Sequence, residues 1–219
     1  MKRFFVLAAI ALPLCASASG EKAPAAPPAG VPKPASDGMS LGFLAGISGG
    51  VLVPFSKLSA SVAATVEAGA LMRWTGHEVG GTVGVSYDQP AASGGVTDPR
   101  VPGGSYTWDL EQRSLIVTPS LLYRMTSLGF IVPYGSVGPR ISFMEQKGSG
   151  VAGSNAIGTT TETLARIGAR GRVGVEFLLG FGGITVDALF EWAPLGSVSA
   201  GVGTSLMGIS AQVGYRLVL

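Results

Sequence analysis

The stretch Thr163–Leu179 reads TLARIGARGRVGVEFLL, and its residues alternate between two kinds. From Ala165 to Phe177 every second position is apolar except for one glycine, whereas the positions between them carry glycine or a charge. This period of two predicts a β-strand with one apolar and one charged face. An Arg side chain at the lipid midplane of a membrane barrel costs about 2–4 kcal/mol. Three arginines on one face therefore predict that this face points into a lumen and that the apolar face meets lipid.

Seven further segments show the same alternation, most of them more weakly. They are Leu41–Val53, Ser61–Trp74, Glu78–Tyr87, Trp108–Arg124, Phe130–Met144, Ile184–Trp192 and Val202–Leu219. Eight strands are the smallest usual number for a membrane barrel. We therefore expect an all-β fold, an eight-stranded antiparallel up-and-down transmembrane β-barrel.

The connections between these segments differ in length in a regular way. The first, third, fifth and seventh have 7, 19, 18 and 9 residues, whereas the three between them have 3, 5 and 4. Membrane barrels have short turns at the periplasmic rim and long loops outside the cell. We therefore expect Asp88–Tyr106 and Glu145–Glu162 to be long extracellular loops, and the N-terminus to lie in the periplasm.

The composition is that of a membrane protein without a transmembrane helix. The 219 residues are 47% hydrophobic and only 13% charged, which excludes a disordered chain and disfavours an ordinary soluble enzyme. After residue 20, no run of 18 apolar residues is free of charge, and a spanning helix needs such a run. A closed β-barrel is the other structure that pairs all of its backbone N–H and C=O groups within lipid. The alternative is a soluble calyx with apolar residues inside, whose outer surface would here be Gly and Ser with few charges.

The N-terminal residues predict export. Two basic residues precede the apolar run Phe4–Leu14, and Ala16-Ser17-Ala18 supplies a small-residue cleavage site, as in a signal peptide. Cys15 leaves a lipoprotein as the alternative, although Leu14 stands where lipidation signals have a small residue. Removal of the signal would leave a mature chain without cysteine. The predicted organisation is a signal peptide at 1–18, a disordered Pro/Ala-rich periplasmic linker at 19–38 and the barrel at 39–219.

Charged residues on the inward faces predict a closed lumen. An eight-stranded barrel is about filled by its interior side chains, so opposite charges there would meet as salt bridges. Arg170 and Arg172 are expected across from Asp187 and Glu191, because a four-residue turn joins their strands. An ion pathway is the alternative. The predicted lumen charge network comprises Glu67, Arg140, Arg166, Arg170, Arg172, Glu176, Asp187 and Glu191.

Aromatic residues near the predicted strand ends indicate where the barrel would meet the two membrane surfaces. Trp and Tyr gather at both interfaces because one part of each side chain is apolar and the other polar. The predicted aromatic girdle comprises Trp74, Tyr87, Tyr123, Tyr134, Trp192 and Tyr215.

Three segments resemble a known family. Val117–Arg124 followed by Val132–Arg140 resembles the P-x-L-x-Y-R, then P-Y-x-x-x-G hairpin of small outer-membrane barrels of the OmpA/OmpX-like group. The ending Val213–Leu219 is similar to the C-terminal insertion signal read by the barrel-assembly machinery, although it ends in Leu rather than the commoner Phe. The resemblance implies the barrel fold and residence in the outer membrane of a Gram-negative-type bacterium. It also implies insertion by that machinery through Tyr215, Leu217 and Leu219.

No pattern in the chain predicts a catalytic site, a metal site or a cofactor. His77 is the only histidine, and it falls in the predicted turn Thr75–His77, at the rim opposite to the one where lipid-modifying barrels work. The predicted function is a non-enzymatic structural or surface-interaction role through the long extracellular loops. The alternatives are a narrow pore or hydrophobic-ligand channel and, third, a lipid-modifying enzyme. The chain is expected to be a monomer that contacts outer-membrane lipid and an unidentified extracellular partner, with no nucleic acid.

Overall fold

The computed structural model describes residues 39–55, 58–100, 103–152, 155–194 and 205–219. All of them belong to one compact unit, Ala35–Leu219. The predicted signal peptide and linker lie outside the described residues. Within the described ranges, no helix is long and apolar enough to cross a membrane.

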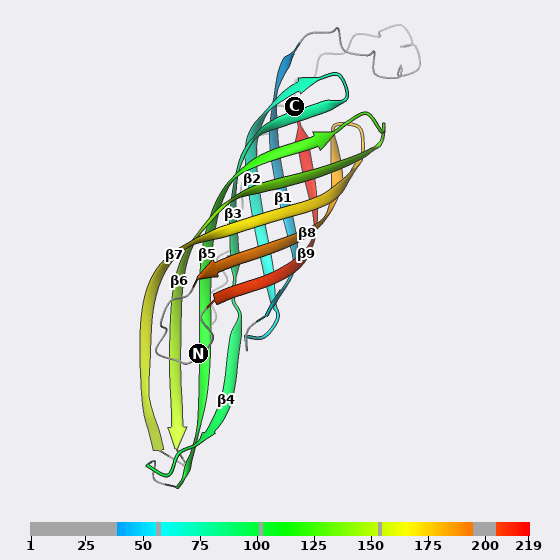
Figure 1. Cartoon of the computed structure of the whole chain (residues 1–219). Coiled ribbons are helices and arrows are strands. Elements are labelled where there is room, and N and C mark those ends of the chain that lie inside the picture. The colour runs from blue at the N-terminus through cyan, green and yellow to red at the C-terminus, as the bar shows by residue number, and fades with distance from the viewer. Residues whose placement is uncertain (1–38, 56–57, 101–102, 153–154, 195–204) are drawn as a thin grey trace, which may run out of the picture. The chain divides into compact units, whose positions relative to one another are not determined.

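The described residues form nine strands, and eight of them match the predicted segments within a few residues at the turn ends. Figure 1 shows their arrangement. The strands are β1 (Ser40–Pro54), β2 (Ser61–Trp74), β3 (His77–Asp88), β4 (Ala91–Thr97), β5 (Ser105–Met125), β6 (Ile131–Ala152), β7 (Asn155–Leu178), β8 (Gly182–Pro194) and β9 (Ser205–Val218).

Eight of these strands close into a ring. Each strand pairs antiparallel with its neighbours in the order β1-β2-β3-β5-β6-β7-β8-β9, and β9 pairs back onto β1, for example Gly46 with Arg216. The ninth strand, β4, continues the path of β3 beyond Gln89 and Pro90 and pairs with β5. The predicted eight-stranded antiparallel up-and-down barrel is therefore confirmed.

The two faces of the ring have opposite chemistry. Large apolar side chains are exposed on the outside of every ring strand, and β8 alternates strictly between exposed and buried residues from Ile184 onward. One outward residue from each strand is Phe43, Val66, Val83, Leu121, Val137, Val173, Val186 and Val213. The inward positions hold buried polar and charged side chains, among them Arg124, Arg140, Glu176, Gln212 and Arg216. This sidedness contradicts the soluble calyx, which requires the apolar face inside.

Two segments expected as long loops are mostly strand. Within Asp88–Tyr106 lies β4, and within Glu145–Glu162 the strands β6 and β7 continue as far as Ala152 and from Asn155. Here β5 pairs with β6 through Arg113–Glu145 and Glu111–Lys147. Both faces are polar or glycine-rich in much of this region, so the apolar alternation that revealed the ring strands is missing. The prediction of long loops is therefore wrong for most of these residues.

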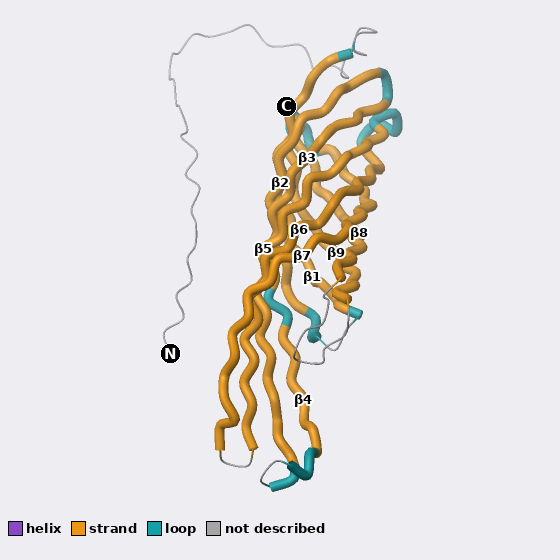
Figure 2. Tube along the Cα trace, turned by 60° about the vertical axis from the view of Figure 1, so that its left-hand side comes forward, coloured by secondary structure: helices purple, strands orange, loops and turns teal. Residues whose placement is uncertain are grey.

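These residues form a four-stranded sheet that leaves the ring. We call β4 and the parts of β5, β6 and β7 at residues 105–113, 145–152 and 155–163 the sheet extension. Figures 1 and 2 show it running on past the ends of β1, β2, β8 and β9. We call this end of the ring the mouth and the opposite end, with the β2–β3, β5–β6 and β7–β8 turns, the turn rim.

Candidate functional site

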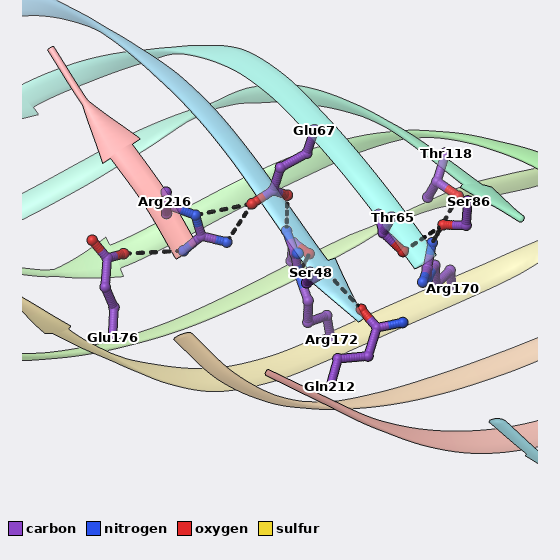
Figure 3. A network of polar contacts seen from close by, with 11 residues as sticks. Ser48, Thr65, Glu67, Ser86, Thr118, Arg170, Arg172, Glu176, Gln212 and Arg216 are labelled. Atoms are coloured by element: carbon purple, nitrogen blue, oxygen red, sulfur yellow. Dashed lines mark hydrogen bonds and ion pairs between the residues drawn. The ribbon is translucent and has the colours of Figure 1, made fainter. Parts of the chain in front are cut away.

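The lumen near the turn rim is filled by alternating cations and anions. Arg216 Nη2 lies 2.6 Å from Glu67 Oε1, and its Nη1 lies 3.1 Å from Glu176 Oε2. Glu176 also holds Arg124 at 2.9 Å, and Arg124 pairs with Glu78. Figure 3 shows how Arg216 reaches both Glu67 and Glu176. We call the connected set Arg73, Glu78, Arg124, Glu176, Arg216, Glu67 and Arg172 the turn-side cluster.

Burial makes the pairing in this cluster obligatory. The side chains of Arg124 and Arg216 are 2% and 1% exposed, and that of Glu176 is fully buried. A buried charge is tolerated only when it is paired and hydrogen-bonded. Every carboxylate of the cluster contacts two arginines, because Glu67 also binds Arg172 at 2.6 Å and Glu78 also binds Arg73 at 3.2 Å. The cluster therefore acts as a solid polar plug.

Tyr134 belongs to this plug and not to the aromatic girdle. The side chain is 5% exposed, and the guanidinium carbons of Arg216 and Arg172 lie 4.2 Å and 5.6 Å from its ring centre. Tyr134 shares its face of β6 with the buried residues Val132 and Arg140, so it points into the lumen. The girdle prediction is wrong at this position, since a residue close to a strand end can face either side.

A second group of charges lies toward the mouth, and we call it the mouth-side cluster: Asp88, Arg140, Arg170 and Glu191. Glu191 is shared by Arg170 at 3.0 Å and Arg140 at 3.4 Å. Arg170 also donates to Ser86 Oγ at 2.9 Å. Arg140, Arg170 and Glu191 are all buried.

The expected pairing across β7 and β8 is half right. Of the two arginines and two carboxylates expected to face each other, Arg170 and Glu191 are direct register partners and form an ion pair. Arg172 stands opposite Leu189 and turns across the lumen to Glu67. Asp187 stands opposite Gly174 and has no hydrogen-bond partner among the described residues. Arg172 and Asp187 therefore do not take part in the expected pairing, because a carboxylate on the far side of the narrow barrel binds Arg172 instead.

Arg166 precedes Arg170 on β7. It is half-buried on β7 nearer the mouth, and its Nη1 donates to the Ala165 carbonyl at 3.1 Å. Sequence reasoning did not include Glu78 and Arg124 in the network. The sequence does place Arg124 on the same face of its strand as the polar residues Ser114, Thr118 and Ser120. The register of β3 and β5 then sets Glu78 opposite Arg124.

Hydroxyl groups fill the lumen between the two clusters. Thr65 and Ser86 lie within 2.9 Å of each other, and Thr118 lies 3.5 Å from Arg170 Nη1. A void lined by Thr65, Thr82, Thr118, Ser120 and Ser136 measures only about 20 Å³. That volume is room for about one water molecule. At this level the described side chains therefore leave little free space in the lumen.

The other predicted girdle residues face outward at two levels. Trp74 and Tyr123 are 42% and 41% exposed near the turn rim, and Tyr87 and Trp192 are 44% and 41% exposed near the mouth. Tyr215 is half-buried on the outward side of β9. This arrangement is typical of residues at membrane–water interfaces.

His77 lies in an aromatic cluster at the turn rim. It is the first residue of β3, and its Nδ1 lies 2.7 Å from the Tyr123 hydroxyl. Its ring centre is 5.9 Å from that of Tyr123 and 6.3 Å from that of Trp74. No group of three or more His, Cys, Asp or Glu side chains is placed to hold a metal ion in the described part of the chain.

The predicted insertion signal closes the ring. The backbones of Leu219 and Phe43 exchange hydrogen bonds of 2.9 and 2.8 Å, so the end of the chain seals β9 against β1. Arg73 Nη2 also donates to the Leu219 carbonyl at 2.8 Å. Tyr215, Leu217 and Leu219 share the outward parity, opposite to the buried Gln212 and Arg216.

Comparison with known proteins gives a likeness of fold. No protein-family model and no curated protein matches this chain. Neisserial surface protein A shares 16% identity, with 82% of this chain and 98% of that chain covered and a TM-score of 0.42. OprG from Pseudomonas aeruginosa is 8% identical, with 82% of this chain and 95% of that chain covered and a TM-score of 0.48. The outer membrane enzyme PagL is 12% identical, with 78% of this chain and 98% of that chain covered and a TM-score of 0.40. These solved structures are outer-membrane proteins, one of them an enzyme, and the matches assign this chain no activity.

Proposed function

We propose that this chain is a non-enzymatic, monomeric outer-membrane β-barrel with a closed lumen, which presents the sheet extension outside the cell as an interaction surface. The observation that carries the proposal is the change of chemistry along the outward face of β5 and β6. Leu115 and Phe143 are 45% and 49% exposed, and the next outward residues toward the mouth are Arg113 and Glu145. An outward apolar band that gives way to charged residues is expected at a membrane surface.

The thickness of the apolar band supports a membrane span. On β5 the outward residues from Leu115 to Tyr123 are apolar or aromatic, a length of nine residues. A tilted barrel strand needs about 9–11 residues to cross the hydrocarbon core. The extension then lies in water beyond the band, with the insertion machinery and outer-membrane lipid as partners and the N-terminal linker in the periplasm.

The lumen argues for a closed barrel and against the narrow pore. An ion entering from either side would have to separate buried Arg–Glu pairs whose charges have no water to replace their partners. The catalytic alternative has no support from the lone His77, which hydrogen-bonds a tyrosine at the turn rim.

The edges of the sheet extension favour recognition of an extended polypeptide. One edge of β7 pairs with β6 from Asn155 onward, and among the described residues no strand pairs with the other edge before Ala169, where β8 begins to pair. An unpaired edge offers a row of backbone N–H and C=O groups to an added strand. The opposite edge, β4, is only seven residues long and is flanked by Pro90 and Pro99, which limit strand addition. The β7 edge lacks proline, and its Thr160, Thr161 and Thr163 favour strand pairing.

Topology is tested by single cysteines, since the predicted mature chain has none. Thr161→Cys in the extension should react with a membrane-impermeant maleimide on intact cells, whereas Thr75→Cys at the turn rim should react only after lysis. The purified protein in planar bilayers should show no conductance steps. Labelling in the reverse pattern would overturn the orientation, and steps would overturn the closed lumen.

Strand addition is tested by adhesion of producing cells to a surface coated with reduced, carboxymethylated α-lactalbumin, an extended polypeptide. N–H directions alternate along a strand, so one of Thr160→Pro and Thr161→Pro removes an N–H of the free edge and the other removes one that faces β6. The free-edge variant should keep the heat-sensitive gel mobility of the barrel and lose adhesion. Adhesion unchanged in both variants, or absent with the parent chain, would contradict the proposed surface.

A further inference from the structure

The sheet extension carries more acidic than basic side chains. Four carboxylates stand against two basic groups in β4 and in the parts of β5, β6 and β7 that form it. The carboxylates belong to Asp109, Glu111, Glu145 and Glu162, and the basic groups to Arg113 and Lys147. The extension therefore has a net negative charge, which favours a basic partner.

The two faces of the extension share these charges unevenly. We call the face that continues the outside of the ring the outer face and the face that continues the lumen the inner face. Five of the six charged residues are exposed on the outer face of β5 and β6. Glu162 is the sixth, and it lies on the inner face because it stands opposite the buried Gln146 and has the same parity on β7 as Arg170. Glu162 is thus the one charged residue on the inner face of the described extension.

Glu162 also belongs to the strand with the unpaired edge. It is half-buried, and its cross-strand neighbour on β6, Gln146, is neutral and donates its amide to Gln112 Oε1 at 3.0 Å. Ala169, where β8 begins to pair, follows seven residues later, a distance of about 23 Å along an extended strand. Among the described strands, none therefore lies beside Glu162 on the edge opposite to β6.

A strand added to this edge would place one residue directly opposite Glu162. Directly opposite side chains in an antiparallel pair lie on the same face, where opposite charges attract and like charges repel. On the outer face, the same strand would meet Thr159, Thr161 and Thr163, which stand opposite outward residues of β6. Threonine pairs well with threonine and other β-branched residues across strands.

We propose that the β7 edge selects an extended segment with Lys or Arg opposite Glu162 and with threonine or another β-branched residue on either side of that base. This inference rests on the proposed strand addition and names the chemistry of the partner. Only the residues opposite the edge count, so a long polypeptide of any net charge can offer such a segment.

Two peptides test this preference: Thr-Lys-Thr-Val-Thr-Val-Thr and the same sequence with Glu in place of Lys. In the antiparallel register, the first residue lies opposite Thr163 and the second opposite Glu162. Each peptide carries a fluorophore at its C-terminus, and its binding to the full-length protein in phosphatidylcholine nanodiscs is followed by fluorescence anisotropy. The Lys peptide should bind at least about threefold more tightly than the Glu peptide, because an opposite-charge pair replaces a like-charge pair.

A charge reversal and a matched control locate the preference. Glu162→Lys should reverse it, so that the Glu peptide becomes the tighter ligand. Glu111→Lys makes the same change in net charge on the outer face of β5, two strands away from the edge, and should keep the preference for the Lys peptide. Both variants should keep the heat-sensitive gel mobility of the barrel.

The outcomes separate this inference from the strand addition itself. Equal binding of the two peptides by the parent chain, or an unchanged preference in Glu162→Lys, would overturn the inference and leave strand addition standing. A reversal in Glu111→Lys as well would overturn it, since net charge alone would then decide. If neither peptide binds while cells still adhere to α-lactalbumin, the inference fails alone, and if adhesion is also absent, strand addition fails with it.

Discussion

The guanidinium carbon of Arg216 lies 4.2 Å from the ring centre of Tyr134, while the edges of the same group bind Glu67 and Glu176. These four side chains come from β9, β6, β2 and β7, so one arginine joins strands on different sides of the ring. The planar group can do this because its face stacks on an aromatic ring and its edges donate hydrogen bonds. A lysine at this position would keep the charge and lose most of these contacts.

Replacement of Glu176 by Ala should destabilise the barrel strongly. The side chain is fully buried between Arg124 and Arg216, and removal of one partner of a buried pair costs about 3–5 kcal/mol because the other charge is left uncompensated. The free energy of unfolding, measured in urea with the protein in lipid vesicles, should fall by this amount. Glu145→Ala is the control: Glu145 is exposed and stands opposite Arg113 in the register, and its removal should change the free energy of unfolding by less than about 1 kcal/mol. Equal effects of the two variants would show that the turn-side cluster does not stabilise the barrel.

Replacement of Gly168 by Ala should also destabilise the barrel. A Cβ atom at this position would lie 1.9 Å from the backbone oxygen of Trp192, so β7 or β8 would have to move. Overpacking of this kind costs about 1–3 kcal/mol. Gly171 lies on the same strand with nothing within 4 Å of its Cβ direction, and Gly171→Ala should leave the urea midpoint nearly unchanged. A neutral Gly168→Ala variant would mean that the strands are not held as closely as described.

Arginine substitutions along the outward face of β6 should map the membrane boundary. Val137 is 62% exposed within the apolar band, and Val137→Arg should cost about 2–4 kcal/mol in vesicles if the residue lies near the midplane. Ser149 is exposed on the same face in the extension, so Ser149→Arg should be close to neutral. The measurement is again the free energy of unfolding in vesicles. Similar costs at the two positions would contradict a boundary between Phe143 and Glu145.

The hairpin end beyond β4 should respond locally to acid. A hydrogen bond from Arg100 lowers the pKa of Asp98 below its ordinary value. A carboxyl whose folded pKa is lowered contributes stability above its unfolded pKa and loses that contribution as the pH falls through the folded value. Local protection of this hairpin should therefore decline only in acid, and Arg100→Gln should raise the pKa of Asp98 in an NMR titration. An unchanged pKa in that variant would contradict the Asp98–Arg100 pairing.

The ring strands could be predicted from sequence because each of them separates an apolar from a polar face. The same reasoning placed Arg170 and Arg172 across from Asp187 and Glu191 because a short turn joins β7 and β8, and the register does set Arg170 opposite Glu191. The sheet extension could not be found in this way, because a strand in water on both faces has no apolar alternation. Contacts across the lumen, such as Arg172 with Glu67, depend on the curvature of the closed ring, which no local pattern contains. Tyr134 shows the remaining difficulty, since its position near a strand end suited either face.

The sheet extension has a mechanical consequence, because β5, β6 and β7 run without a break from the apolar band into the extension. A flexible loop loses conformational entropy when a partner immobilises it, and that loss weakens binding. A paired sheet is already ordered, so a partner strand at the β7 edge would dock on a preorganised surface. Any pull on such a partner would be transmitted through hydrogen-bonded strands directly to the barrel wall. The extension would thus act as a rigid support for a bound partner and not as a flexible linker.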